Sequence, residues 1–210
     1  MLENIEVLCH SSIKISKDKV IYIDPFKIDK EYNDADYIFI THDHYDHFSI
    51  EDIGKVIKDT TMIIMPENVY NKAIKVGIKQ DRIVSVVPSD TYTVNGLSFG
   101  TVLAYNKDKD FHPKENNWVG YILYINSDRY YIAGDTDMTE DNMKVKCDVA
   151  FVPVGGIYTM TYKEAAELVN NIKPKIAVPT HYGSIVGSKE DADNFIKLLN
   201  KDIESKILIK

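Results

Sequence analysis

Histidine and aspartate residues are concentrated in one short segment, Thr41–His47, which reads THDHYDH and holds three of the six histidines of the chain. This segment directly follows Tyr37–Ile40, an apolar run typical of a buried strand, so a rigid element would position its side chains. Residues two apart in extended backbone project to the same side. The spacing therefore predicts that His42 and His44 bind one metal ion together.

The second half of the segment supplies another pair of ligands. Asp46 and His47 follow after the chain has turned, and they can face a second ion beside the first. Imidazole and carboxylate groups suit zinc, with bonds of roughly 2.0–2.2 Å, and they also suit iron or manganese. The alternative is a solvated loop, but three histidines and two aspartates in six residues favour a metal site.

The composition is that of a soluble globular protein. The chain has 210 residues, of which 44% are hydrophobic and 27% charged, with a net charge of -7. Such a charge argues against a nucleic-acid or membrane partner and favours a small-molecule substrate, while homo-oligomerisation is left open. The start of the chain lacks the pattern of a signal peptide, and Cys9 and Cys147 are far apart in apolar surroundings. We therefore expect a cytoplasmic protein with free thiols.

Short apolar runs of strand length alternate with helix-like segments along the chain. The strand-like runs are IEVLC, VIYID, DYIFIT, MIIMP, IVSVV, LSFGTVLAY, VGYILYI, RYYIAGD, VAFVPV, IAVPTH and a last strand, SKILIK. The helices are expected to begin near Ser49, Pro66, Thr161 and Ser188. Between residues 83 and 133 only strands and hairpin turns are expected. The pattern predicts an α/β protein of two mixed sheets with helices outside, a four-layer α/β/β/α sandwich, as one domain over residues 1–210.

The motif HxHxDH from His42 resembles that of the metallo-β-lactamase fold superfamily. The pattern of that family continues with an aspartate at the end of a later strand and then a histidine, for which Asp135 and His181 are the candidates. Both directly follow apolar runs and would reach the same sheet edge as the motif. The resemblance implies that Asp135 bridges two metal ions, and that His181 completes the second site with Asp46 and His47.

The third ligand of the first ion is less clearly specified. The family usually supplies a histidine between the first motif and the bridging aspartate, and His112 is the only histidine available there. Asn106 is an alternative ligand. His112 could instead face the substrate from its loop.

Nearly the whole chain resembles a subgroup of small members of the superfamily. This subgroup includes ascorbate-6-phosphate lactonase and other metal-dependent hydrolases, and it shows segments similar to those around His10 and Asp24, to Pro153–Met160 and to Lys173–Gly183. Asp24 is expected to orient a ligand histidine, or else to be a turn residue before Pro25. His10 is placed in the same supporting group.

The resemblance implies a metal-dependent hydrolase, most simply a dinuclear zinc enzyme, with Mn²⁺ or Fe²⁺ as other options. A metal pair can lower the pKa of a bridging water and so supply hydroxide to attack an ester, lactone or phosphodiester bond. Asp46 would also orient the hydroxide and accept its proton. The two alternatives are a metal-binding ligand sensor without turnover and an iron-dependent redox protein.

Residues after the later strands are expected to contact the substrate. They are Tyr158, Thr159, Met160 and Tyr182. Three lysines around His112 could attract an anionic group of the substrate, or could simply belong to a solvated loop: Lys107, Lys109 and Lys114.

Overall fold

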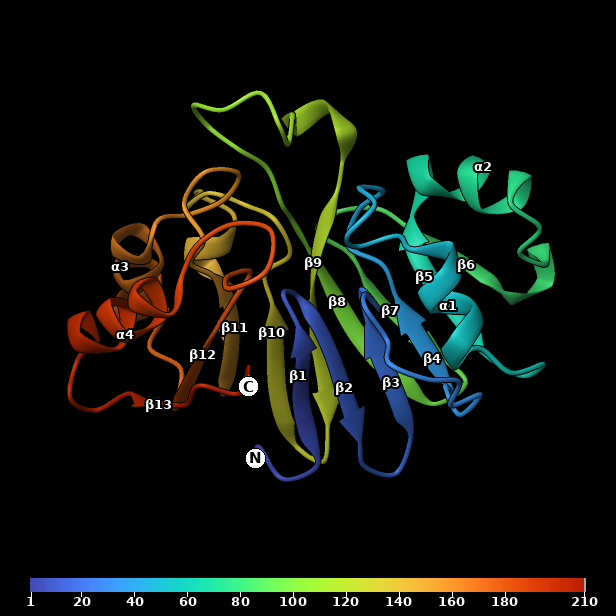
Figure 1. The fold of residues 1–210 in the computed structure, drawn as a ribbon, viewed down its shortest axis with the longest axis horizontal. Coiled ribbons are helices and arrows are strands. Elements are labelled where there is room, and N and C mark those ends of the chain that lie inside the picture. Colours follow the sequence, from blue (N-terminus) through green and yellow to red (C-terminus); the bar gives the residue numbers. More distant parts are fainter. Residues whose placement is uncertain (210) are drawn as a thin grey trace. The chain divides into compact units, whose positions relative to one another are not determined.

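The chain divides into two compact units, each built on one β-sheet (Figure 1). The computed structural model describes residues 1–209. The N-terminal unit comprises Leu2–Val87 with the end of the chain from Ile209, and the C-terminal unit comprises Pro88–Leu208 with Met1. A single domain over residues 1–210 stays a prediction.

The N-terminal unit holds a six-stranded sheet whose strands lie in chain order. They are β1 (Ile5–Cys9), β2 (Ser12–Ser16), β3 (Val20–Ile23), β4 (Tyr37–Phe39), β5 (Met62–Pro66) and β6 (Ile83–Val86). The first three pair antiparallel, and β3 to β6 pair parallel. Helices α1 (Ile50–Val56) and α2 (Glu67–Lys75) provide the crossovers between the parallel strands, and the 3₁₀ turn η1 (Gln80–Arg82) precedes β6.

The core of the N-terminal unit forms where α1 and α2 cover one face of this sheet. Ile53 and Val56 of α1 and Val69 of α2 belong to the same buried apolar cluster as Ile38 and Ile63 of the sheet. Side chains alternate between the two faces of a strand, so one set of apolar positions anchors the helices. The cluster thereby fixes β4, the strand whose end carries the THDHYDH segment.

The C-terminal unit holds a seven-stranded sheet in the order β13-β12-β11-β10-β9-β8-β7. The strands are β7 (Thr91–Val94), β8 (Leu97–Leu103), β9 (Val119–Ile125), β10 (Asp128–Ile132), β11 (Val149–Pro153), β12 (Ile176–Thr180) and β13 (Glu204–Ser205). Strands β7 to β10 pair antiparallel and β10 to β13 pair parallel. The 3₁₀ turns η2 (Lys114–Asn116) and η3 (Asn142–Lys144) lie between strands.

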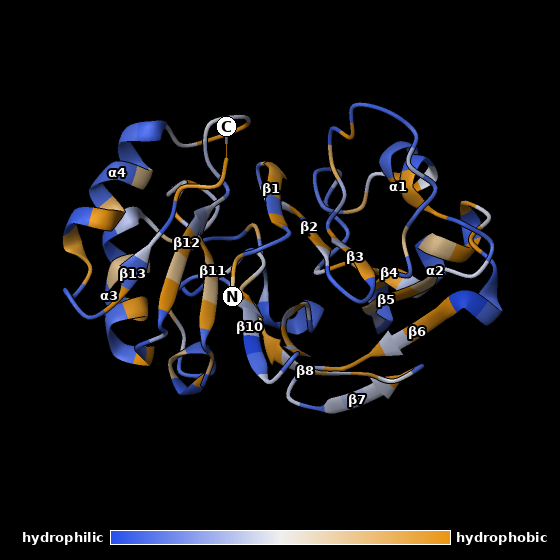
Figure 2. Ribbon diagram, turned by 90° about the horizontal axis from the view of Figure 1, so that it is seen from below, coloured by the Kyte–Doolittle hydropathy of each residue, from blue (hydrophilic) through white to orange (hydrophobic). Residues whose placement is uncertain are grey.

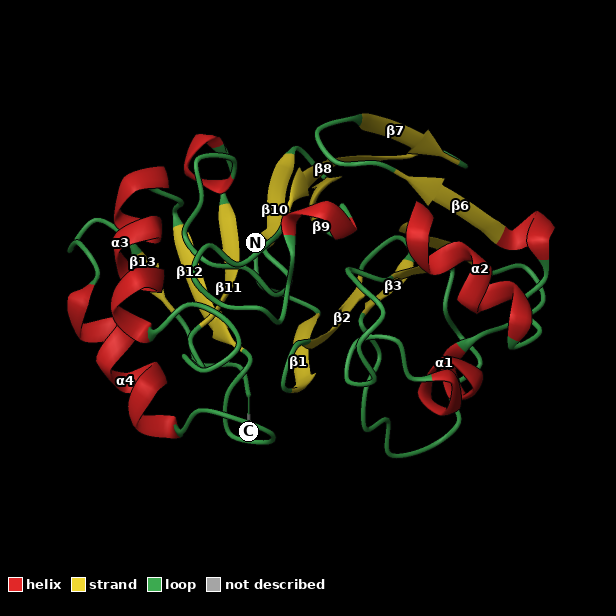
Figure 3. Cartoon of the chain, turned by 90° about the horizontal axis from the view of Figure 1, so that it is seen from above, coloured by secondary structure: helices red, strands yellow, loops and turns green. Residues whose placement is uncertain are grey.

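Helices α3 (Tyr162–Ile172) and α4 (Lys189–Leu198) pack on β11 and β12 and against each other (Figure 3). Every residue of β11 and β12 is buried, and Figure 2 shows both strands mainly in the hydrophobic colours. A parallel strand covered on its faces needs such a continuous apolar run. These two strands are therefore rigid supports for the loops that follow them.

In each sheet, the candidate metal-site residues follow strands that end at the same edge. In the N-terminal unit, β1, β3 and β4 run in the same direction, so their carboxyl ends bring His10, Asp24 and the THDHYDH segment to one edge. In the C-terminal unit, β10 and β12 likewise end just before Asp135 and His181.

The elements agree with the sequence pattern except in three places. All four helices begin within a residue of the predicted signals, and the segment between residues 83 and 133 forms strands and hairpins with short 3₁₀ turns. Strands β2 and β7 were not predicted, because their runs SIKIS and TYTV carry only two apolar residues each. The last strand was predicted as SKILIK, which is wrong for the described residues, since β13 covers only Glu204–Ser205; residue 210 lies outside the described residues.

Within residues 1–209, no helix combines the length and the apolar character needed to cross a membrane. Both cysteines are free thiols, and burial raises the pKa of Cys147 to about 12.

The N-terminus of α3 is held by a reciprocal pair of hydrogen bonds. The backbone N–H of Thr161 donates to Glu164 Oε2 at 2.8 Å, and the Glu164 N–H donates to Thr161 Oγ1 at 3.3 Å. Thr161→Ala should lower the free energy of unfolding by about 1 kcal/mol, measured by urea denaturation. The exposed mid-helix variant Glu167→Ala serves as the control, and equal effects of the two variants would contradict a specific capping role.

Candidate metal centre

Asp24 holds two segments of the N-terminal unit together. Its carboxylate accepts hydrogen bonds from the Thr41 backbone N–H (2.8 Å), from Thr41 Oγ1 (2.7 Å) and from His47 Nδ1 (2.7 Å). Complete burial raises the pKa of the Asp24 carboxyl above its ordinary value, although the contacts with His47 and Thr41 oppose the shift. Because a carboxylate only accepts, His47 carries its proton on Nδ1 and directs the lone pair of Nε2 away from Asp24.

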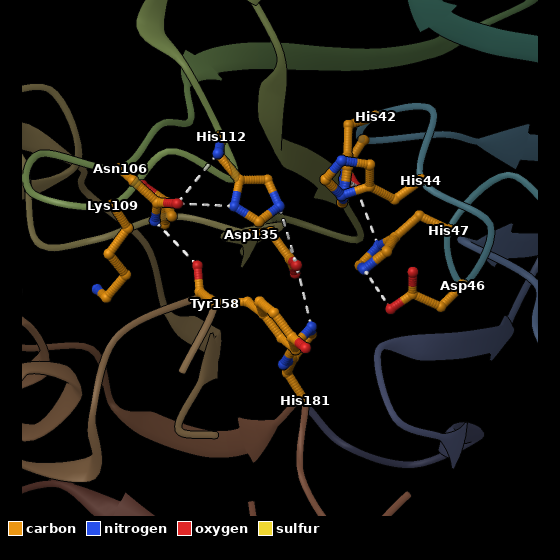
Figure 4. Close-up of polar contacts among 12 residues, drawn as sticks. His42, His44, Asp46, His47, Asn106, Lys109, His112, Asp135, Tyr158 and His181 are labelled. Carbon is orange, nitrogen blue, oxygen red and sulfur yellow. Dashed lines mark hydrogen bonds and ion pairs between the residues drawn. The ribbon is translucent and has the colours of Figure 1, made fainter. Parts of the chain in front are cut away.

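The same network orients His42. The Thr41 hydroxyl has one proton, which it donates to Asp24, so it accepts from His42 Nδ1 at 3.0 Å. His42 Nε2 is therefore left with a lone pair, and it lies 3.1 Å from His44 Nδ1 (Figure 4). One buried carboxylate thus sets the tautomers of two histidines.

Asp46 lies between two histidines of the N-terminal unit. Its Oδ2 is 3.5 Å from His47 Nε2 and 3.4 Å from His10 Nε2, and both imidazoles are buried. The His47 and Phe48 backbone N–H groups donate to the His44 carbonyl, which produces the turn between the two halves of the THDHYDH segment. The turn returns His47 to His42, and the centroids of the two rings are 4.0 Å apart.

Asp135 is the centre of the corresponding set in the C-terminal unit. Its Oδ2 lies 3.2 Å from His112 Nε2 and 3.0 Å from His181 Nε2, and all three side chains are at most 3% exposed (Figure 4). The structure thus brings His112, Asp135 and His181 together within one unit.

Asn106, the alternative to His112 as a ligand, is the hydrogen-bond partner of His112. Asn106 Oδ1 accepts from the His112 backbone N–H at 3.1 Å and from His112 Nδ1 at 2.9 Å. The His112 ring also packs edge-on against Trp118, with ring centroids 5.5 Å apart. His112 is therefore oriented through Nδ1, and its Nε2 faces Asp135.

Two glycines allow His181 to reach its position. His181 has a φ of 57° in the left-handed region, where a residue with a side chain is strained. A Cβ on Gly155 would lie 2.3 Å from the His181 carbonyl oxygen, and one on Gly187 would lie 2.8 Å from Gly155 Cα. The close approach of these backbones requires glycine at both positions.

The expected substrate residues differ in their surroundings. Tyr158 is partly exposed and packs edge-on against Phe111, with ring centroids 4.7 Å apart. Thr159 and Met160 are fully buried. Tyr182 is 3% exposed, and burial together with the charge of Asp193 raises its pKa to about 12. Among residues 1–209, the hydroxyls of Thr159 and Tyr182 have no hydrogen-bond partner.

The lysines near His112 are largely engaged by other groups. Lys109 Nζ forms an ion pair with the buried Asp137, and Lys114 Nζ lies 4.7 Å from the centre of the Tyr105 ring. A cavity of about 580 Å³ beside this loop is lined by three lysines and also by three acidic residues: Asp108, Asp110 and Glu115. The lining therefore has no excess of positive charge to attract an anion.

The sequence pattern missed the supporting roles of Thr41, Asn106, Asp137 and Gly155. Asp137 stands two residues after Asp135 in the segment GDTD, so a second carboxylate close to a candidate ligand was a usable signal. The other roles depend on contacts between residues distant in sequence, such as Asn106 with Tyr158.

Within each unit taken by itself, the spacing of the candidate donor atoms suits tetrahedral metal coordination. Two ligand atoms that each lie about 2.0–2.1 Å from such an ion are about 3.3 Å apart. The facing pairs are 3.1 and 3.5 Å apart in the N-terminal unit and 3.2 and 3.0 Å apart in the C-terminal unit. For His47 and His112 the proton lies on Nδ1, so their Nε2 lone pairs face a carboxylate oxygen. Such buried pairs repel unless a cation lies between them.

Comparison with known proteins places the chain in a family. Residues 4–181 match the family model of the β-lactamase superfamily domain, and the chain belongs to that superfamily. It is 31% identical to a UPF0173 metal-dependent hydrolase from Pyrococcus abyssi over 209 residues, which cover 93% of this chain and 91% of that protein. The chain thus belongs to a family of metal-dependent hydrolases.

Solved structures confirm the predicted α/β/β/α fold class. A protein from Parabacteroides distasonis, described as a metal-dependent hydrolase, matches with a TM-score of 0.82 and 31% identity over 98% of this chain and 93% of that one. CmlA, a diiron β-hydroxylase from Streptomyces venezuelae, shares the fold with a TM-score of 0.78 at 12% identity, covering 98% of this chain and 52% of its own.

Replacing Asp24 tests the network of the N-terminal unit. In the wild type the Thr41 hydroxyl and His47 Nδ1 both donate to Asp24. In Asp24→Asn one of them would instead face an amide N–H. Where that group is His47 Nδ1, the proton of His47 would move to Nε2, because Nδ1 would then have to accept. We expect the affinity for one metal ion to fall about 10- to 100-fold, measured by competition with a chromophoric chelator. Asp34→Asn is the matched control, since Asp34 binds Lys14 and Tyr22 in the same unit. Equal affinities of the two variants would contradict this role.

Replacing Gly155 tests the support of His181. Gly155→Ala would force the His181 carbonyl away, and we expect at least about a 10-fold loss of affinity for one ion by chelator competition. Gly54→Ala is the control, because no atom lies within 4 Å of a Cβ placed there. Unchanged metal binding in Gly155→Ala would show that the loop adjusts without moving His181.

Proposed function

We propose that the chain is a dinuclear metal-dependent hydrolase acting on a small molecule. The observation that carries the proposal is the position of Asp135 Oδ2, 3.2 Å from His112 Nε2 and 3.0 Å from His181 Nε2. One buried carboxylate oxygen that faces two imidazole nitrogens suits a bridging ligand between two cations.

The proposed ligands form two sets joined by Asp135. The first ion would be held by His42, His44 and His112, and the second by Asp46, His47 and His181. Both sets contain only imidazole and carboxylate groups, which suit Zn²⁺, and Mn²⁺ or Fe²⁺ as well. Zinc is the favoured metal for a hydrolytic reaction, because it needs no redox change.

When bound, a pair of divalent ions supplies a water molecule that loses its proton near neutral pH and a positive charge that stabilises the transition state. Asp46 would orient this water and accept its proton. Asp24 and Thr41 would keep His47 and His42 in the tautomers that leave Nε2 for the metal.

An ester, lactone or phosphodiester of a small molecule is the proposed substrate. Tyr158 and Thr159 follow β11 at the edge that also carries Asp135 and His181, which supports a role in substrate contact, with Met160 and Tyr182 beside them. The net charge of -7 favours a small-molecule partner over nucleic acid. The two free thiols support a reducing, cytoplasmic location.

Removing the bridging carboxylate tests the proposal directly. Asp135→Ala should lose bound metal and hydrolytic activity together, since both ions would lose a ligand. Metal is measured by elemental analysis, and activity by a screen of lactones, phosphodiesters and thioesters after chelation and return of zinc or manganese.

Asp141→Ala is the control, because Asp141 is a half-buried carboxylate of the same unit that lies outside the ligand set. Two ions retained by Asp135→Ala would show that the bridge is misassigned. A folded wild-type protein that binds no metal would overturn the proposed function itself.

A further inference from the structure

We propose that Asn106 is a positioning residue that holds His112 ready for its metal ion and couples this ligand to the backbone of the loop at Tyr158. This inference rests on the proposed function. Asn106 follows β8, is 6% exposed, and uses both ends of its amide within the C-terminal unit (Figure 4). A single neutral side chain thus connects a proposed metal ligand with a proposed substrate loop.

The amide of Asn106 has only one orientation that satisfies its neighbours. Asn106 Nδ2 donates to Asp137 Oδ1 at 3.1 Å and to the Tyr158 carbonyl oxygen at 3.0 Å. Both of these atoms only accept hydrogen bonds. A flipped amide would place its oxygen against two other oxygens, so Oδ1 must face His112.

The fixed amide determines where His112 carries its proton. Asn106 Oδ1 is an acceptor 2.9 Å from His112 Nδ1, so that nitrogen must carry the hydrogen. The lone pair of His112 is then on Nε2, which lies 3.2 Å from Asp135 Oδ2. Since metal ions bind the unprotonated nitrogen, Asn106 selects the form of His112 that the proposed site requires.

Asp137 anchors the amide in turn. Asp137 is 4% exposed, accepts from the Lys107 backbone N–H at 2.9 Å and pairs with Lys109 Nζ. The charge of Lys109 compensates the buried carboxylate and allows it to hold Asn106 Nδ2. Lys109 therefore has a positioning role, in place of the anion-attracting role considered from the sequence.

The contact with Tyr158 extends the effect of Asn106 to the substrate. The Tyr158 carbonyl precedes Thr159, and it is held by the same amide group that orients His112. A change at Asn106 should therefore alter both metal binding and the Michaelis constant. A residue with a purely structural role would change the stability of the protein, and no variant of it would restore metal affinity while the Michaelis constant stayed raised.

Three variants separate the contributions of the two ends of the amide. Asn106→Leu removes all four side-chain hydrogen bonds at similar volume. Asn106→Asp keeps the acceptor for His112 but places two carboxylates side by side. The double variant Asn106→Asp/Asp137→Asn reverses the pair, so that position 137 donates to position 106, while the Tyr158 carbonyl still lacks its donor.

We expect Asn106→Leu to lose about 10- to 100-fold in affinity for one of two ions, with the other ion unchanged. The double variant should recover this affinity to within a few-fold of the wild type and keep a raised KM. The affinities are measured by chelator competition, and the visible spectrum of the Co²⁺-loaded protein reports the geometry of the site. Asn170→Leu is the matched control, because Asn170 bonds the Leu198 carbonyl on the helices of the same unit.

Each outcome supports or overturns the inference. Wild-type affinities and an unchanged Co²⁺ spectrum in Asn106→Leu would overturn the positioning role. A folded double variant that stays as weak as Asn106→Leu would show that the amide orientation is not the cause. If KM recovers together with metal affinity, the coupling to Tyr158 is wrong. Absence of metal binding in the wild type would instead overturn the proposed function.

Discussion

Buried electron-pair donors that face one another are the constraint on which the described residues around the site depend. The Nδ1 atoms of three histidines donate hydrogen bonds: His42 to Thr41, His47 to Asp24 and His112 to Asn106. The Nε2 atoms of His47 and His112 consequently present lone pairs to carboxylate oxygens of Asp46 and Asp135, at 3.5 and 3.2 Å, while His42 Nε2 faces His44 Nδ1 at 3.1 Å. A lone pair that faces a buried carboxylate oxygen is unfavourable without positive charge, and this supports the proposed metal sites at His47 and His112.

Within each unit, the sheet explains how the candidate ligands reach one of its edges. Parallel strands place their carboxyl ends together, and the residues immediately after them adopt uncommon backbone conformations. His10, Asp24 and His181 all have a positive φ, at 56°, 47° and 57°. Strain of this kind persists only where the surroundings hold it, and here the fully buried strands and the network around Asp24 do so. Local strain is thus balanced by packing and hydrogen bonding within each unit.

The sequence was informative where chemistry is local and less so where it depends on tertiary contacts. The alternation of strand-like and helix-like runs was enough to predict the fold class, and the spacing in THDHYDH was enough to predict a metal site, to which the family resemblance added Asp135 and His181 as candidates. Strand β2 was missed because its run SIKIS is weakly apolar and forms a strand by pairing with both neighbours, β1 and β3. The role of Asn106 could not be predicted, since its partners Asp137 and Tyr158 are 31 and 52 residues away.

The partners behind the histidines carry unequal charge, and this has a consequence for the two proposed ions. His47 is backed by the carboxylate of Asp24, which increases the basicity of its imidazole, whereas His112 is backed by the neutral amide of Asn106. Asp46 adds a further negative charge to the set of His47. His47 therefore has two carboxylates as neighbours, Asp24 at Nδ1 and Asp46 near Nε2, whereas His112 has a neutral amide on one side and Asp135 on the other. Two histidines with similar tautomers thus differ in the negative charge around them, and so in how strongly their surroundings would attract a cation.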